Sequence, residues 1–598
     1  MATSVEKGKP KVSYVVTPAD LVSHRIHVSA EVQGIPPDTQ SVDFVMPVWT
    51  PGSYEIRDYS RNVRGCTART LGGEALPVTK VLKNRWRVPL GGEPVLIFSY
   101  TVYGHELSTQ GLDITPEHVY MNGAHVFCYL DGTLGSPLDV TLNLPPGWKV
   151  FTELLEVEKN PPRFRAKDFD ELVDSPIEMG NPAEYTIRPG GIPHRIIFCG
   201  TGGNFSPHRV EEDLGKMVET TRKLFGTLPM NHYTFFFHLA DKWDGGLEHA
   251  TSTSIVLPHN IFRPKKSYEE FLDVTCHEYF HLFNVKRIRP AVLGPFDYSQ
   301  ENYTRLLWAM EGTTDYYTFL LLRRAGLLTP KRYLSIVGKH IKRYLETPGR
   351  LVQSLEESSF DSWIDLYHPY EESRNSSISY YLKGELVSMC LDLEIRGKSG
   401  NTKSLDDVMR HLWKDYGARD KGLSEDGYLK ESEKATGLDL GPFFRNYVSG
   451  TTEVDFSTYF GYAGLDLSSE EKEGDKDDEE EKPAFLGVDP EKGDALRIAV
   501  VVEGSPAHRA GLTAGDEIVA IDGTRVTMGN MGEALRRYEP GDKVDVTFFR
   551  RARLGTLSVT LGKAPPEKWM IKPKSAPAPE QKRLFESWLE TTWDGIAK

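Results

Sequence analysis

The sequence predicts a multidomain α+β protein, and three observations carry that prediction. The chain has 598 residues, which at about 150 residues per domain favours several domains. Apolar and polar residues alternate with period two through residues 1–190, whereas helical periodicity dominates from residue 266 to about 450. A dense acidic run at 470–482 then separates a last Gly-rich unit from the rest of the chain.

Residues 1–190 are predicted to form a β-rich, sandwich-like domain. The period-two alternation is clear at 24–32, 95–104 and 138–147. Turns rich in Gly, Pro and Asp separate these segments at short intervals, which is typical of an all-β sandwich.

Residues 191–455 are predicted to form a second domain, an antiparallel sheet followed by helices. Its strands are expected at 194–203, 233–241 and 251–258, with a helix at 211–226. From residue 266 onward, apolar residues recur at helical spacing, so helices should dominate this half of the domain.

The carboxy-terminal part is predicted to be a linker, a compact unit and a tail. The acidic run holds nine acidic and three basic residues, and such a segment cannot bury apolar surface, so 456–483 is expected to be a solvated linker. Strands and Gly-rich turns follow at 484–565. The tail at 566–598 ends in the amphipathic segment RLFESWLETTWDGIAK, which is expected to dock on the body.

Composition excludes several classes of function. With 71 basic and 85 acidic residues the formal net charge is −14, so the chain lacks the positive footprint that nucleic acid partners require. No apolar run approaches the ~20 residues that span a bilayer, so no membrane partner is expected. Five scattered cysteines form no disulfide framework. The sequence begins without a signal-peptide pattern, which favours the cytoplasm, although a trimmed amino terminus would leave export open.

The most informative stretch is His277-Glu278-Tyr279-Phe280-His281. On a helix, residues four apart lie on one face with Cβ atoms about 5–6 Å apart. Two imidazoles placed in this way can bind one zinc ion, and the intervening glutamate can act on the water that the metal activates. Apolar residues on both sides indicate a buried helix. The pattern predicts a hydrolytic zinc site.

A catalytic zinc ion needs a third protein ligand, and Glu311 in the segment WAMEG is the candidate. Glu311 lies among apolar residues, where an unpaired carboxylate is costly. Either a metal ion or a salt bridge to a nearby arginine would remove that cost. Asp315 follows one helical turn later, where it can accept a hydrogen bond from the far nitrogen of a ligating histidine.

Two more segments have residues suited to peptide chemistry. Gly245 and Gly246 would let a substrate backbone approach closely, and Glu248 beside them offers a negative charge for the α-ammonium of a peptide. Tyr380 and Tyr381 begin the segment YYLKG. A tyrosine hydroxyl can donate to the oxyanion that forms when a carbonyl is attacked, although packing alone would also explain this pair.

Together these segments resemble a known family. In chain order, GGLEH, HEYFH, WAMEG and YLKG resemble the GxMEN, HExxH, WxxEG and YxKG elements of thermolysin-like zinc aminopeptidases. The longer segments MPVWTPGSYEIRDYSRNV, HEYFHLFNVKRIRPAVLGPFDY and LLWAMEGTTDYY are similar to the glycyl aminopeptidase family. The resemblance implies a β-rich amino-terminal domain, a thermolysin-like catalytic domain and a carboxy-terminal PDZ domain.

The resemblance also implies an activity, which is removal of amino-terminal glycine, and to a lesser extent alanine, from peptides with a free amino terminus. It implies one Zn²⁺ per chain. The residue roles that it implies are zinc ligation by His277, His281 and Glu311, general base for Glu278, amino-terminal anchor for Glu248, and oxyanion donor for Tyr381, with Tyr380 as the other choice.

Two other functions stay open. The same zinc site would cleave internal bonds if the cleft is open beyond Glu248, which would make the chain an endopeptidase. Alternatively, the chain is a PDZ-centred binding protein with an unused metal site. In the PDZ-like unit, Phe485-Leu486-Gly487-Val488 has the form of a carboxylate-binding loop, which would take the C-terminal end of a peptide as an added strand.

Overall fold

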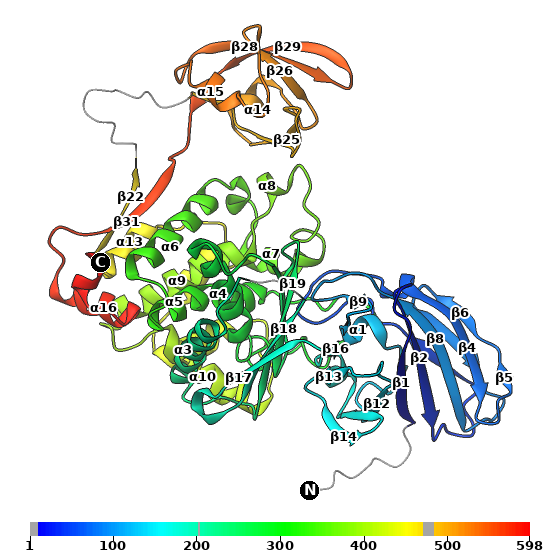
Figure 1. The fold of residues 1–598 in the computed structure, drawn as a ribbon. Coiled ribbons are helices and arrows are strands. Elements are labelled where there is room, and N and C mark those ends of the chain that lie inside the picture. The colour runs from blue at the N-terminus through cyan, green and yellow to red at the C-terminus, as the bar shows by residue number, and fades with distance from the viewer. Residues whose placement is uncertain (1–9, 201–203, 471–483, 598) are drawn as a thin grey trace. The chain divides into compact units, whose positions relative to one another are not determined.

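The computed structural model describes residues 10–200, 204–470 and 484–597 (Figure 1). The chain divides into two compact units, one of residues 1–303 with 412–424 and the other of residues 304–411 with 425–598. The acidic run at 470–482 falls almost entirely outside the described residues, as does the end of the strand expected at 194–203.

Three sheets form the β-rich amino-terminal part of the first unit. The largest contains, in spatial order, β14 (Leu155–Lys159), β15 (Pro162–Ala166), β12 (Leu138–Leu142), β1 (Lys11–Asp20), β2 (Arg25–Gln33), β8 (Val95–Tyr103), β4 (Val63–Thr70) and β5 (Ala75–Leu76). A second contains β11 (Tyr129–Leu130), β3 (Ser41–Val45), β7 (Arg85–Pro89) and β6 (Thr79–Leu82). The third contains β13 (Lys149–Phe151), β16 (Ile177–Gly180), β10 (His118–Met121) and β9 (Leu112–Ile114).

The strands follow the alternation that the sequence shows. In β2, Ile26, Val28 and Ala30 are fully buried, while the residues between them are half-buried. These side chains join one core that also contains the large rings of Tyr14 and Phe98. Two short helices complete this part, α1 (Gly123–Val126) and α2 (Phe169–Val173).

A five-stranded sheet follows, in the order β17 (Ala183–Ile187), β18 (His194–Cys199), β19 (Tyr233–Ala240), β21 (Ser252–Pro258) and β20 (Gly245–Glu248). The prediction of an antiparallel sheet is wrong in its centre, because β18 pairs with β19, and β19 with β21, in parallel. The helix α3 (Pro207–Phe225) explains the first pairing, since parallel neighbours need a long crossover connection. β20 is the edge strand and pairs antiparallel with β21.

Helix α4 (Lys265–Phe280) covers one face of this sheet. The ring of Phe271 packs against Phe237, with ring centroids 5.2 Å apart, and Tyr279 packs against Phe235 at 5.7 Å. Because strand side chains alternate, Phe236 and His238 point to the opposite face.

The second unit is mainly helical. Its longest buried element is α9 (Tyr380–Lys398), nearly all of whose side chains are inaccessible. Other helical elements between residues 308 and 462 are η3 (Trp308–Gly312), α5 (Thr313–Arg324), α6 (Pro330–Leu345), α7 (Leu355–Phe360), α8 (Ser373–Ser376), α10 (Leu405–Asp415), α11 (Gly427–Thr436), α12 (Gly441–Tyr447) and α13 (Phe456–Tyr462).

The PDZ-like unit is inserted between two paired strands. β22 (Leu465–Glu470) runs antiparallel to β31 (Lys568–Pro573), with Glu470 opposite Lys568 (Figure 1). Between them lie β23 (Ala484–Phe485), β24 (Val488–Pro490), β25 (Ile498–Val501), α14 (Pro506–Ala510), β26 (Glu517–Ile521), β27 (Thr524–Arg525), α15 (Met531–Leu535), β28 (Lys543–Arg550), β29 (Arg553–Thr560) and β30 (Gly562–Lys563), which share a core of their own.

The segments on both sides of the PDZ-like unit form helices and strands. The first part of the predicted linker is not a linker, because α13 and β22 occupy it. The tail forms α16 (Pro579–Leu589), and its Trp588 is fully buried and donates a hydrogen bond from Nε1 to the hydroxyl of Tyr316 at 2.9 Å. The amphipathic segment therefore docks as its pattern predicted.

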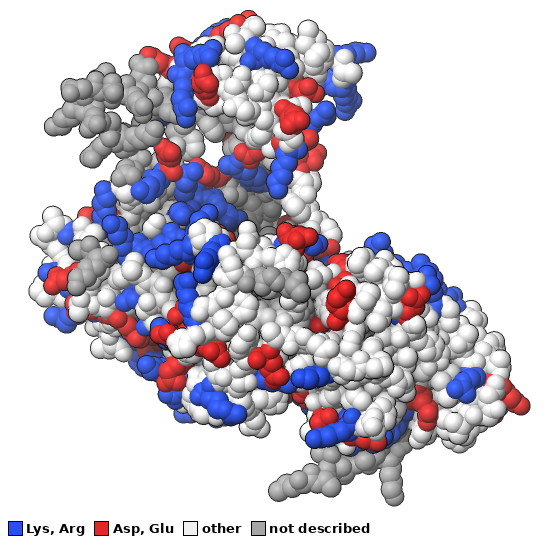
Figure 2. Space-filling view, viewed as in Figure 1, with Lys and Arg blue, Asp and Glu red and all other residues white. Residues whose placement is uncertain are grey.

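The surface charge is uneven although the chain is acidic overall. Figure 2 shows Lys and Arg side chains gathered around α6, whose exposed face carries Lys331, Lys339 and Arg343. Among the described residues, no helix is both long enough and apolar enough to cross a membrane. The five cysteines all lie among the described residues, and none of them forms a disulfide bond.

Candidate metal centre and peptide-binding edge

The histidine pair lies at the carboxyl end of α4. His277 belongs to the last turn of this helix, and His281 follows Phe280 with helical backbone angles and donates its backbone N–H to the carbonyl of His277. The two Nε2 atoms face each other at 2.9 Å. Each imidazole therefore directs a ring nitrogen to the same point, which is the arrangement that the i, i+4 spacing predicts.

The ring of His281 is held by the loop that follows it. Its Nδ1 lies 2.9 Å from the backbone carbonyl of Asn284, so Nδ1 carries the proton and the lone pair of Nε2 is directed toward His277. The next residue, Val285, has φ = 87°, an uncommon conformation for a β-branched side chain. Strain of this kind persists where the surroundings enforce it, and here it accompanies the turn that presents the Asn284 carbonyl.

Glu278 lies beside Gly246 of the edge strand. Glu278 is 6% exposed. A Cβ atom at position 246 would overlap with that carboxylate, so only glycine leaves the space that Glu278 occupies. Gly245 has φ = 103° and open space where its side chain would be. The glycine pair therefore has a role beyond the expected approach of a substrate backbone, because Gly246 also accommodates Glu278.

Glu248 ends β20 and is 4% exposed. Its neighbour is Gly52, from the loop of the β-rich domain that contains the sequence MPVWTPGSY. A Cβ on Gly52 would lie 2.7 and 2.8 Å from the two carboxylate oxygens of Glu248, and Gly52 has φ = 91°. Sequence reasoning included this loop in the family resemblance but missed Gly52 as a site residue. Its signal was the PG pair in a segment rich in aromatic and charged residues.

Glu311 lies in a single π-helical turn, η3, and is 2% exposed. The N–H of Thr313 bonds to the carbonyl of Trp308, the wide i, i+5 pattern of such a turn. Turns of this type occur frequently at functional sites. The helical periodicity of the sequence predicted a helix here but not its π-helical start.

The glycines of WAMEG and YLKG meet. A Cβ on Gly312 would lie 2.5 Å from the Cα of Gly384, and one on Gly384 would lie 2.9 Å from the carbonyl oxygen of Trp308. The backbones of η3 and α9 are therefore in close contact at these two glycines. This contact fixes the start of α9, with its two tyrosines, against the turn that holds Glu311.

The two tyrosines at the start of α9 differ in their surroundings. Burial raises the pKa of Tyr381 well above its ordinary value, and the negative charge of Glu311 raises it further, so the hydroxyl keeps its proton. Tyr380 is fully buried, and its ring stacks on that of Tyr381 with centroids 4.8 Å apart. These observations favour Tyr381 as a donor to a ligand.

Two groups of described side chains have the residue types and spacing of a metal site. One is the expected set of His277, His281 and Glu311, whose ligand atoms lie within 4.8 Å of one another. Two imidazoles and a carboxylate are a donor set that catalytic zinc sites use, so these residues fit the metal that the family resemblance implies. The second group is His118, Glu178 and His238. Asp315 is half-buried on α5, and its supporting role stays a prediction.

Comparison with known proteins identifies the families of three segments of the chain. The model of the M61 peptidase N-terminal domain matches residues 13–181, that of M61 glycyl aminopeptidase matches 270–387, and that of a PDZ domain matches 497–548. The crystal structure of an aminopeptidase N family protein from Idiomarina loihiensis is 30% identical, with a TM-score of 0.87, over 97% of this chain and 100% of that one.

An M1 zinc metallopeptidase from Deinococcus radiodurans is a more distant structural neighbour. It is 15% identical, with a TM-score of 0.47, over 75% of this chain and 96% of that one. No curated protein sequence matches the chain.

The fold and the site define a metallo-aminopeptidase that carries a PDZ domain. The chain belongs to the M61 glycyl aminopeptidase family.

Proposed function

We propose that the chain is a zinc aminopeptidase that removes amino-terminal glycine, and less readily alanine, from peptides. The observation that carries the proposal is the convergence of the His277 and His281 Nε2 atoms, 2.9 Å apart, on the helix turn that also contains the buried Glu278. The preference for glycine is supported by the family description.

The proposed ligands of one zinc ion are His277, His281 and Glu311. When bound, zinc supplies a Lewis acid that polarises the scissile carbonyl and lowers the pKa of water. Among the protein groups, Glu278 takes the proton of the attacking water and passes it to the leaving amine. Tyr381 donates its hydroxyl proton to the oxyanion, which is consistent with a raised pKa that keeps this group protonated.

The edge strand β20 supplies the substrate-binding surface in this proposal. One side of β20 pairs with β21, and its other side lies at the edge of the sheet, where an extended peptide can add as a further strand. Glu248, at the end of that strand, would pair with the α-ammonium group. This pairing would fix the register, so that the first peptide bond is the one that is cleaved.

For the PDZ domain, we propose capture of a peptide C-terminus at Phe485-Leu486-Gly487-Val488. Gly487 has φ = 85°, and its carbonyl accepts hydrogen bonds from the N–H of Val502 at 3.0 Å and the hydroxyl of Ser505 at 3.1 Å. These contacts hold the carbonyl of Gly487 toward the domain. The N–H groups of the loop would then be available to a peptide carboxylate.

The anchoring role is tested with Glu248→Gln, which removes the charge but keeps the size of the side chain. We expect kcat/KM for Gly-initiated peptides with a free amino terminus to fall about 10- to 100-fold, because a charged hydrogen bond contributes ~1.5–3 kcal/mol. Glu117→Gln, an exposed position in the same unit, is the matched control. Equal losses on free and N-acetylated peptides would contradict the anchor, and efficient cleavage of acetylated peptides would indicate an endopeptidase.

A further inference from the structure

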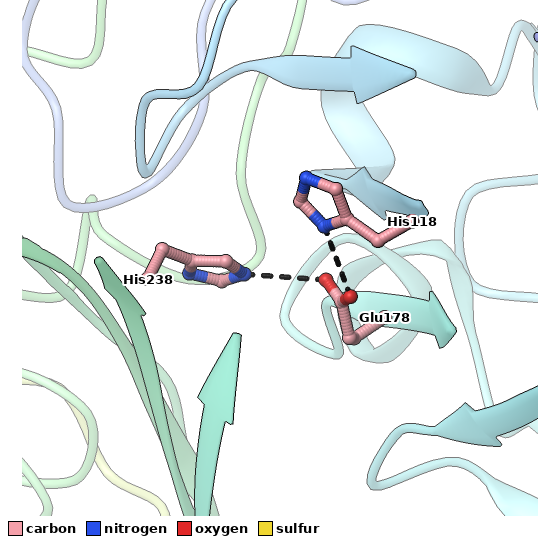
Figure 3. Close-up of side chains that lie close together, drawn as sticks. All are labelled: His118, Glu178 and His238. Atoms are coloured by element: carbon pink, nitrogen blue, oxygen red, sulfur yellow. Dashed lines mark hydrogen bonds and ion pairs between the residues drawn. The ribbon is translucent and has the colours of Figure 1, made fainter. Parts of the chain in front are cut away.

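A second cluster of histidine and glutamate lies away from α4, where the amino-terminal sheet β13-β16-β10-β9 meets the sheet that contains β19. His118 comes from β10, Glu178 from β16 and His238 from β19. Figure 3 shows the carboxylate of Glu178 between the two imidazole rings. The ligand atoms of the three residues lie within 4.8 Å of one another.

The strand register explains why these three side chains converge. Glu178 pairs with Tyr120 across β16 and β10, and His118 pairs with Gly180, so His118 and Glu178 are diagonal neighbours on one face of their sheet. Glycine at position 180 avoids a close contact with His118, because a Cβ there would lie 3.2 Å from the Cβ of His118. His238 points to them from the face of its own sheet that lies opposite α4.

The polar contacts within the cluster are short and shielded from solvent. Nδ1 of His118 lies 3.0 Å from one oxygen of Glu178, and Nε2 of His238 lies 3.2 Å from the other. The side chains of Glu178 and His238 are each 1% exposed, and that of His118 is 19% exposed. On the far side of His118, Nε2 lies 3.1 Å from Asp113, a carboxylate that orients the ring as the partners of metal-bound histidines do.

The charges of this cluster are not balanced by lysine or arginine. Within the described part of the chain, the ion pairs of Glu178 and Asp113 are all with histidines, namely His105, His118 and His238. Burying two carboxylates is costly unless positive charge compensates them. A protonated His118 offsets one of the two negative charges, whereas a divalent cation in place of that proton offsets both.

From this geometry we propose a second metal site, in which His118, Glu178 and His238 bind a divalent transition metal, with Zn²⁺ as the expected ion. Two imidazole nitrogens and one carboxylate oxygen are ligands that Zn²⁺ accepts, and they suit Mg²⁺ and Ca²⁺ poorly because those ions prefer oxygen. The site joins strands of two sheets, so its role is structural: it ties the β-rich domain to the sheet of the peptidase domain.

The direct test counts zinc in the full-length protein after chelator stripping, reloading with Zn²⁺ and gel filtration. We expect two zinc ions per chain in the wild type, one in His238→Gln, one in Glu178→Gln and one in His281→Ala, which removes a ligand of the proposed catalytic site. The double variant H238Q/H281A should bind none. His232→Gln, a histidine with 47% side-chain exposure in the same unit, is the control and should keep two.

His281→Ala keeps the test decisive if substitution at position 238 impairs folding. One zinc in this variant, together with a zinc-dependent rise in Tm, supports the second site, because a ligand that binds only the folded state stabilises it. One zinc in the wild type and none in His281→Ala overturns the second site and leaves the catalytic site intact. One zinc that is lost in His238→Gln but kept in His281→Ala supports the second site and contradicts the proposed catalytic ligands.

Discussion

Gly246 and Glu278 show how one backbone position controls the place of the proposed general base. The carboxylate of Glu278 occupies the space where a residue at position 246 would place its Cβ atom. A methyl group there would have to displace the carboxylate from its observed position. At the scale of the residue, the motif glycine therefore contributes to geometry and not only to substrate access.

The close contact of position 246 with Glu278 predicts the outcome of two substitutions. Gly246→Ala should lower kcat on Gly-initiated peptides while zinc content stays unchanged, because the general base moves and the ligands do not. Glu278→Gln gives the reference value, since loss of a general base costs about 10²–10⁴-fold.

The control is Gly215→Ala in α3, where an added Cβ meets no atom within 4 Å. Its activity should equal that of the wild type. Full activity of Gly246→Ala, or loss of zinc from Glu278→Gln, would contradict the geometry described for this pair.

The elements that present Glu311 and Tyr381 depend on a contact between two backbones. Gly312 and Gly384 allow η3 and α9 to touch, and any side chain at position 312 would meet backbone atoms that cannot rotate away. The close approach explains in physical terms why two separate motifs, WAMEG and YLKG, both end in glycine.

We expect Gly312→Ala to destabilise the protein by about 1–3 kcal/mol, the usual cost of an overpacked interior. Activity should fall as well, because the displaced element carries Glu311. Chemical unfolding and peptide hydrolysis measure the two effects. Gly215→Ala again serves as the control, because alanine in a helix that has space for it is neutral or stabilising. An unchanged midpoint of unfolding in Gly312→Ala would show that the contact does not determine how α9 packs.

Periodicity and spacing predicted much of the fold and the approach of His277 to His281, for clear physical reasons. Alternation located β2 and β8, and the i, i+4 rule placed His277 and His281 on one helix face, because both depend only on local geometry. The parallel pairing of β18 with β19, the π-helical turn at Glu311 and the contact of Gly52 with Glu248 depend on partners distant in sequence. A single sequence contains no signal for them, apart from the glycines themselves.

At the scale of the whole molecule, the PDZ domain is an insertion rather than an appendage. Glu470 and Lys568 are paired neighbours, so the chain leaves through β22 and returns through β31 at the same place. β31 also packs closely on α6, where a side chain at Gly338 would overlap with the carbonyl of Trp569. The returning strand therefore belongs to the helical body.

We expect that replacing residues 471–567 with a two-residue Asn-Gly turn converts β22 and β31 into a hairpin and leaves a folded peptidase. Hydrolysis of short Gly-initiated peptides should be retained, and binding of peptide C-termini should be lost. Deletion from residue 471 to the carboxyl terminus is the contrasting variant, and it should unfold the body, because it also removes β31 and the buried Trp588. Loss of folding in the hairpin variant would show that the PDZ domain is required for the body to fold.

Peptide hydrolysis by metal-free and by zinc-loaded protein tests most directly whether this chain is a metal-dependent aminopeptidase. Gly-initiated peptides with free and with N-acetylated amino termini are incubated with full-length protein that has been stripped by a chelator, and with the same protein reloaded with Zn²⁺. We predict release of glycine from the free peptide alone, and only by the reloaded protein. Cleavage by the stripped protein, or no cleavage of the free peptide by protein shown to contain zinc, would contradict the account.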